Sequence, residues 1–398
     1  MIKNVNGIIY ITLTILGLII LINNKTSKIS IDEKLLFIAL STLFITSQLT
    51  TFLTDTEYKY IWVFVYLPLT IPIYIYIKNT PIKPFYFWYG LVLGALISSN
   101  IAIYEIWKNL PRAQSITHPI IFGNLSLCMG FLSISGIGWF KKQHKYLIFL
   151  PILAAISGLI SSALSGTRGG WVSIPFILLT YVWYSKKNLS VKSTTIAIIS
   201  TTVLFSALYI IPQTTIKSNI NRTLTSIEDY NNGDIESHYY ATSIGARFEM
   251  WKAAWKIFTE NPGTGVGWHN FKKHAQKQVD DGLRNRTVGL HTNAHSLYLS
   301  ILATGGTLNF ISLIVLFSIL IYLFVKKIDN SKTPEARQFA LAGLILIVIF
   351  MITGISSSPL ERARPSNFFS FYLAFIMAFI YRFEKGLEES YGREEKEL

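Results

Sequence analysis

The sequence has 398 residues, of which 51% are hydrophobic and only 15% are charged, and its mean hydropathy is +0.41. About 25% of the residues in an average soluble domain are charged, so this composition excludes a soluble protein. The net charge of +14 could suggest nucleic-acid binding, but membrane topology itself requires basic residues in short loops, so we expect no nucleic-acid partner.

Apolar runs of 16 to 23 residues recur along the chain. Each is close to the ~20 residues that a helix needs to cross a hydrocarbon core of ~30 Å. The sequence therefore predicts an all-α polytopic integral membrane protein with about eleven transmembrane helices. The predicted spans are residues 7–22, 35–53, 60–77, 85–106, 119–140, 146–164, 171–184, 193–211, 308–325, 339–355 and 368–383.

Lysine and arginine counts in the short loops predict the orientation, because cytoplasmic loops carry an excess of both. The loops after spans 1, 3, 5, 7 and 9 and the C-terminal tail hold 19 such residues, whereas the opposite side holds 7. We therefore expect the first set in the cytoplasm. The predicted parts are an N-terminal transmembrane bundle of about eight spans (1–211), a large outer loop (212–307), three C-terminal transmembrane helices (308–383) and a cytoplasmic tail (384–398).

Arg168 lies in a six-residue break, residues 165–170, that is predicted between two spans at the outer face. A permanently charged guanidinium group in so short a turn must find an anion or polar partners. Its flanking glycines would let a large ligand approach closely. An arginine that snorkels to helix-end carbonyl groups explains the position equally well, so both interpretations stay open.

The stretch 212–295 is the only long hydrophilic part of the sequence. From residue 245 onward, aromatic residues recur at helical spacing and predict an amphipathic helix. This helix is expected either to lie along the membrane surface or to pack on the rest of the loop. Either arrangement places Arg247 at the helix start, near the outer membrane face. The aromatic residues are Phe248, Trp251, Trp255 and Phe258.

Two further segments complete the outer loop. Glycines at alternate positions in 261–268 predict a tight turn that returns the chain to the membrane, because no strand precedes them as in a dinucleotide-binding loop. His291 and His295 are four residues apart and could share one helix face as metal ligands. No acidic residue lies within nine residues to complete such a site, so we expect no metal. The helix after His295 is expected to close at 305–306.

These residues resemble the O-antigen ligase and polymerase superfamily of bacterial inner membranes, and within it the lipid A-core:surface polymer ligases. Two departures are Ser296, where the family usually has asparagine, and the span count of eleven, where these ligases usually have twelve. The resemblance is carried by Thr167-Arg168-Gly169, by Ile244-Gly245-Ala246-Arg247-Phe248 with the tryptophan helix, by Asn261-Pro262 with Gly265 and Gly267, and by the His295 helix that ends at Gly305.

The resemblance implies a metal-independent, inverting glycosyltransferase without a cofactor, which acts in lipopolysaccharide biosynthesis. Its donor would be O-antigen on undecaprenyl diphosphate, and its acceptor a sugar hydroxyl of lipid A-core at the periplasmic face. Arg168 and Arg247 would bind the diphosphate bidentately. His295, with a pKa near ~6.5, would take the proton of the hydroxyl, so activity should rise with pH through that value. His291, Arg362 and Arg364 are secondary candidates.

Three alternatives remain open from the sequence. An O-antigen polymerase or a protein O-oligosaccharyltransferase of the same superfamily would use the same donor with another acceptor. A non-enzymatic polysaccharide-lipid flippase belongs to a different class. It would carry charged residues within several spans, whereas here they gather at one face.

Overall fold

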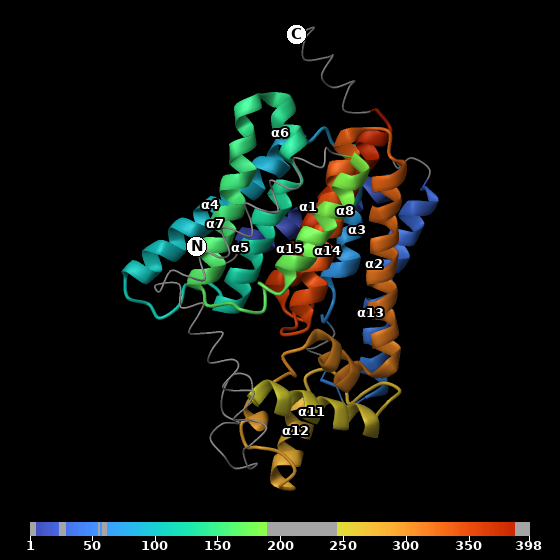
Figure 1. Cartoon of the computed structure of the whole chain (residues 1–398). Helices are drawn as coiled ribbons and strands as arrows, with labels where there is room; N and C mark the ends of the chain where they lie inside the picture. Colours follow the sequence, from blue (N-terminus) through green and yellow to red (C-terminus); the bar gives the residue numbers. More distant parts are fainter. Residues whose placement is uncertain (1–4, 24–28, 55, 58–61, 189–244, 387–398) are drawn as a thin grey trace.

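The computed structural model describes residues 5–23, 29–54, 56–57, 62–188 and 245–386. They form a helical bundle with a smaller helical unit at one end, which we call the cap (residues 245–305; Figure 1). The predicted span 193–211, the loop residues 212–244 and the tail residues 387–398 lie outside the described residues.

The described helices confirm an all-α polytopic membrane protein. Six of them are long and apolar enough to cross a membrane, and a bent pair, α5 and α6, brings the number to seven. Two shorter apolar helices, α1 and α8, accompany them. The bundle helices are α1 (Val5–Ile22), α2 (Ile31–Leu53), α3 (Tyr66–Asn79), α4 (Pro84–Trp107), α5 (Pro119–Ile134), α6 (Ile137–Gln143), α7 (Phe149–Leu164), α8 (Ser173–Asn188), α14 (Pro334–Gly354), α15 (Ala363–Glu384) and most of α13 (Leu297–Asn330).

Two predicted spans differ from the helices observed. The span predicted at 119–140 bends by 54° between α5 and α6. A side chain at Gly136, in the bend, would collide with the indole ring of Trp88, so tertiary packing fixes the bend at this glycine. The span predicted at 60–77 begins as a helix only at Tyr66, because Phe64 before it has a left-handed φ of 62°.

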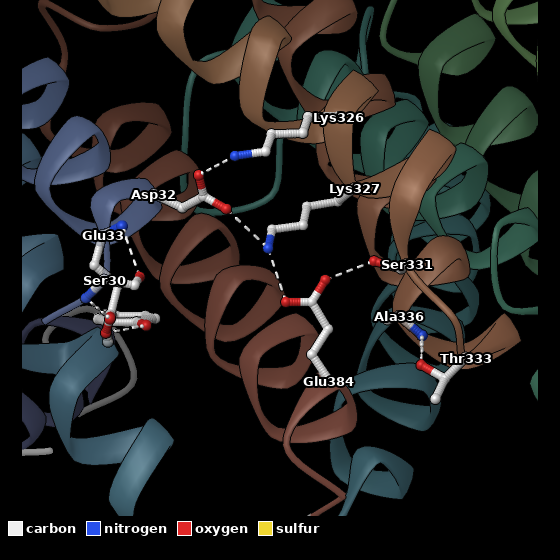
Figure 2. Close-up of polar contacts among 10 residues, drawn as sticks. Ser30, Asp32, Glu33, Lys326, Lys327, Ser331, Thr333, Ala336 and Glu384 are labelled. Atoms are coloured by element: carbon white, nitrogen blue, oxygen red, sulfur yellow. Dashed lines mark hydrogen bonds and ion pairs between the residues drawn. The ribbon is translucent and has the colours of Figure 1, made fainter. Parts of the chain in front are cut away.

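Ion pairs join three helices at the end of the bundle opposite the cap (Figure 2). The carboxylate of Asp32 on α2 contacts Lys326 at 2.6 Å and Lys327 at 2.9 Å, both on α13. Lys327 also contacts Glu384 on α15 at 2.7 Å. Partly exposed pairs of this kind each contribute little free energy, so their main effect is to fix the helix ends relative to one another.

The cap consists of α11 (Gly245–Glu260), α12 (Phe271–Asp280), a short 3₁₀ helix, η6 (Val288–Leu290), and the first part of α13. The predicted helix at 245 is confirmed as α11. Its buried face is made of small and apolar residues together with Glu249, whereas Trp255 on the aromatic face is 54% exposed. The helix therefore packs on the rest of the cap through Ala246, Met250, Ala253, Ala254 and Ile257.

Helix α13 is broken at Gly306, whose φ of 65° and ψ of −168° are not helical. A break leaves backbone groups of both halves without helical partners. The turn 262–267 supplies these partners, which confirms the turn predicted at 261–268 and explains its position against α13. The hydrogen-bonded pairs are Val266–Ala303 (3.0 Å), Gly267–Thr304 (2.9 Å), Thr307–Pro262 (2.8 Å) and Leu308–Gly263 (3.3 Å).

Trp268, directly after this turn, anchors the cap to the bundle. Its indole Nε1 donates a hydrogen bond to the carbonyl oxygen of Ser47 on α2, at 3.1 Å. The ring makes a T-shaped contact with Phe64, with ring centroids 5.3 Å apart. Because the anchor is buried and hydrogen-bonded, it holds the cap in a fixed position over this end of the bundle.

Candidate active site

Four connecting segments meet at the cap end of the bundle: 108–118, 165–172, 291–296 and 355–362. Backbone and side-chain hydrogen bonds join them. The N–H of Ala113 donates to Leu164 at 3.0 Å, and the N–H of Leu297, directly after the third segment, donates to Ser357 at 3.0 Å. The predicted site residues other than Arg247 and Arg364 lie on these segments.

The turn between α7 and α8 carries Arg168 and is eight residues long, two more than predicted. A side chain at Gly169 would collide with the hydroxyl oxygen of Ser356, and one at Gly170 with the side chain of Asn124 on α5. The glycines therefore let the turn pack between α5 and the 355–362 segment. This packing fixes the backbone on which Arg168 stands.

Arg112 adds a guanidinium group that sequence reasoning did not single out. Its Nε donates to the carbonyl oxygen of Ser165 at 2.7 Å, so it ties the 108–118 segment to the turn of Arg168. The carboxylate of Glu105 holds the same segment by accepting the backbone N–H groups of Gln114 and Ser115, at 2.7 and 3.0 Å.

Arg247 lies in the first turn of α11 and is half-buried. Burial lowers the pKa of its guanidinium group, and the charges of Arg168 and Arg112 lower it further. The positive end of the helix dipole also disfavours a cation at this position. We call Arg112, Arg168 and Arg247 the arginine cluster. A phosphate group is the ligand that best offsets three neighbouring guanidinium charges.

His295 lies in the loop before α13 and not on the helix, which corrects the placement expected from the sequence. It adopts a left-handed φ of 49°, and its N–H donates to the side-chain oxygen of Asn293 at 3.1 Å. Ser296, the departure from the family pattern, is the N-cap of α13 and accepts the N–H of Leu299 at 3.5 Å. Ser296 thus ends the loop that presents His295.

The environment of His295 depresses its basicity. Burial, together with four neighbouring basic groups, lowers the pKa of the imidazole to about 4. The pKa of ~6.5 expected from the sequence is therefore wrong for the ligand-free protein, and His295 is unprotonated at neutral pH. The four groups are His291, Arg247, Arg362 and His118.

His291 is the nearest of these partners in the chain. Its ring lies 5.3 Å from that of His295, centroid to centroid, and nearly perpendicular to it, at 86°. Within the described part of the chain, no group of three or more His, Cys, Asp or Glu side chains could hold a metal ion.

Comparison with known proteins identifies the family. Residues 152–314 match the family described as O-antigen ligase. A protein of Haemophilus influenzae, named only as uncharacterized, is 31% identical over 381 residues, which cover 92% of each chain. The chain belongs to the O-antigen ligase family. The resemblance inferred from the surroundings of Arg168, Arg247 and His295 is thereby confirmed, and all three residues lie within the matched segment.

In this member of the O-antigen ligase family, electrostatic contacts link the three primary candidates with two of the secondary ones. The charge of Arg247 lowers the pKa of His295, and the charge of Arg168 lowers the pKa of Arg247. His291 and Arg362 also lower the pKa of His295. Arg364, by contrast, is exposed in the first turn of α15 and lies outside the pocket lined by His295.

Sequence reasoning missed Arg112, His118 and Glu361. Arg112 and Arg168 carried the same signal, because both lie in short loops that are predicted to be outer, where basic residues are uncommon. His118 precedes Pro119 at the start of a span, a pattern typical of a helix N-cap followed by Pro at the first helical position. Glu361 carried no sequence signal, because its raised pKa, about 8, results from burial in the fold.

Proposed function

We propose that this protein transfers O-antigen from undecaprenyl diphosphate to a sugar hydroxyl of lipid A-core, at the periplasmic face of the bacterial inner membrane. The observation that carries the proposal is an unprotonated histidine, His295, next to a half-buried arginine cluster in a membrane protein of the O-antigen ligase family. Neither a cofactor nor a metal ion is part of the proposed reaction.

In the proposed reaction, the diphosphate of the donor binds to Arg168 and Arg247. Each guanidinium group can donate two parallel hydrogen bonds to phosphate oxygens. Arg112 holds the turn of Arg168 in place and adds positive charge. The cluster stabilises the negative charge that develops on the diphosphate as the anomeric bond breaks. Since a diphosphate is already a good leaving group, ATP is not required.

His295 takes the proton of the acceptor hydroxyl while its oxygen attacks the anomeric carbon. The new bond forms between this oxygen and the anomeric carbon, and the bond from that carbon to the phosphate oxygen breaks. Undecaprenyl diphosphate leaves with the electron pair. Because this is a single displacement, the anomeric configuration inverts. The bound diphosphate raises the low pKa of His295 through its negative charge, which strengthens the base when both substrates are present.

A reconstituted assay tests the proposal and separates it from the alternatives. The purified protein is supplied with an undecaprenyl diphosphate-linked glycan and one of three acceptors: lipid A-core, a second lipid-linked glycan, or a protein. We expect a glycan-bearing lipid A-core and an equal amount of undecaprenyl diphosphate, detected by mass spectrometry without ATP.

Other products would overturn the proposal. An elongated lipid-linked glycan would identify a polymerase, and a glycosylated protein an O-oligosaccharyltransferase. Movement of the lipid-linked glycan across vesicle membranes without any transfer would identify a flippase.

A further inference from the structure

His295 lines a pocket of about 530 Å³, including the part open to solvent, between α5, α14 and the 355–362 segment. Two further basic side chains line it, His118 and Arg362. The remaining lining is uncharged and largely apolar, with the polar side chains of Asn124, Thr353, Ser357 and Ser358. It consists mainly of Ile120, Ile121, Leu125, Ile349, Phe350 and Pro365.

The basic groups of His118 and Arg362 are available to a ligand. The Nδ1 of His118 accepts the N–H of Ile120 at 3.3 Å, which leaves Nε2 as the nitrogen that can donate. The guanidinium group of Arg362 makes no hydrogen bond or ion pair with any side chain that the structure describes. Both residues are N-caps, of α5 and α15, and the partial positive charges of these helix ends add to the charge of Arg362.

The neighbouring carboxyl group does not neutralise this pair. Glu361 precedes Arg362, but burial raises the pKa of its carboxyl group to about 8, so it is mostly uncharged at pH 7. One of its oxygens, Oε1, is buried without a hydrogen-bond partner among the described residues. The charges that act on His118 are those of Arg362 and Arg112, both positive. Arg362 therefore keeps its positive charge, whereas burial and these charges lower the pKa of His118, which adds a neutral Nε2–H donor.

We propose that His118 and Arg362 bind a phosphate group carried by the acceptor sugar chain, at a site separate from the arginine cluster. This inference rests on the proposed function. The pair shares a pocket with His295, whereas Arg168 and Arg247 do not line that pocket. In a single displacement the base contacts the acceptor hydroxyl, so the pocket of His295 is the acceptor side of the site. A phosphate held by His118 and Arg362 would place a nearby hydroxyl at His295.

The test compares two acceptors that differ only in this phosphate. One is a core oligosaccharide with a single phosphomonoester, and the other is the same oligosaccharide after phosphatase treatment. Hydrogen bonds to charged groups predict that the wild type uses the phosphorylated acceptor with a kcat/KM on the order of 10- to 100-fold higher. In Arg362→Gln and in His118→Gln, this ratio should fall towards one.

Arg364→Gln is the matched control, because Arg364 is two residues away, exposed and outside the pocket. It should keep the wild-type ratio. Two results would overturn the inference: a wild type that does not distinguish the two acceptors, or an Arg362→Gln variant that keeps the ratio but has a raised KM for the donor. The second result would assign the pair to the donor diphosphate.

Direct binding separates failure of this inference from failure of the proposed function. If the wild type transfers glycan to neither acceptor, the proposed function fails, and the affinities for both oligosaccharides are measured by calorimetry. Tighter binding of the phosphorylated oligosaccharide by the wild type, lost in Arg362→Gln, would still support the phosphate site. Equal affinities would reject it.

Discussion

The low pKa of His295 predicts an unusual pH profile for transfer. A base with an ordinary histidine pKa of ~6.5 is about 9% unprotonated at pH 5.5 and about 91% unprotonated at pH 7.5, so activity would change about tenfold between them. With the pKa lowered to about 4, His295 stays almost fully unprotonated over this range. Because the unprotonated form is the active one, we expect kcat/KM to fall only as pH drops through about 4.

The assay measures kcat/KM for the donor from pH 4.5 to 8 in detergent, since this parameter reports the free enzyme, and over this range it should change less than about twofold. The parameter kcat reports the complex, where the bound diphosphate raises the pKa of His295, so its acid limb should lie at higher pH. Circular dichroism at each pH shows that the fold is intact. A nuclear magnetic resonance titration of the His295 ring, assigned with His295→Gln, separates its ionisation from that of the phosphates.

A tenfold loss of kcat/KM between pH 7.5 and 5.5, matched by a His295 titration midpoint near 6.5, would refute this reasoning. It would mean that neither burial nor the basic groups around the ring, His291, Arg247, Arg362 and His118, lower the pKa of His295 in the ligand-free protein. Arg362→Gln tests the direction of this effect, because removing a nearby positive charge should raise the titration midpoint of His295.

Three further predictions concern Arg168 and Arg247, the break of α13 at Gly306 and the membrane topology. Arg168→Ala and Arg247→Ala should each lower kcat on the order of 10²- to 10³-fold, with poor rescue by lysine, and full activity of Arg168→Lys would indicate a snorkelling arginine instead. Gly306→Ala should lower the thermal unfolding temperature and the free energy of unfolding, the latter by roughly 1–3 kcal/mol. The reasons are the φ of 65° at Gly306 and a collision of the added side chain with the turn 262–267. Gly263→Ala is the control and should not lower either quantity, because the space around Gly263 is open. A reporter active only in the cytoplasm should work when fused to the C-terminus and fail when inserted after Gly282 in the cap; the reverse would contradict the predicted orientation.

Hydropathy located most described spans because the membrane itself dictates a long apolar run. The predicted spans 35–53 and 85–106 correspond to α2 (Ile31–Leu53) and α4 (Pro84–Trp107). Hydropathy could not place the break of α13, which depends on hydrogen bonds from a turn distant in sequence. The bend at Gly136 likewise depends on Trp88, on another helix.

The candidate site was predictable to the extent that local residue patterns carried it. The surroundings of Arg168, Arg247 and His295 gave the family resemblance. The pKa of His295 could not be predicted, because it depends on burial and on His118 and Arg362, which come from segments far away in the chain. For the same reason, Arg362 and Arg364 were equivalent in the sequence, and only the fold distinguishes them.

The most direct test of the proposed reaction measures donor binding and glycan transfer in His295→Ala. If His295 takes the proton of the acceptor hydroxyl, the purified variant should still bind the undecaprenyl diphosphate-linked glycan. Its transfer to lipid A-core should fall by ~10²- to 10⁴-fold, while His291→Ala keeps most of the rate. Comparable transfer by the wild type and a folded His295→Ala variant would contradict the proposal that His295 is the base.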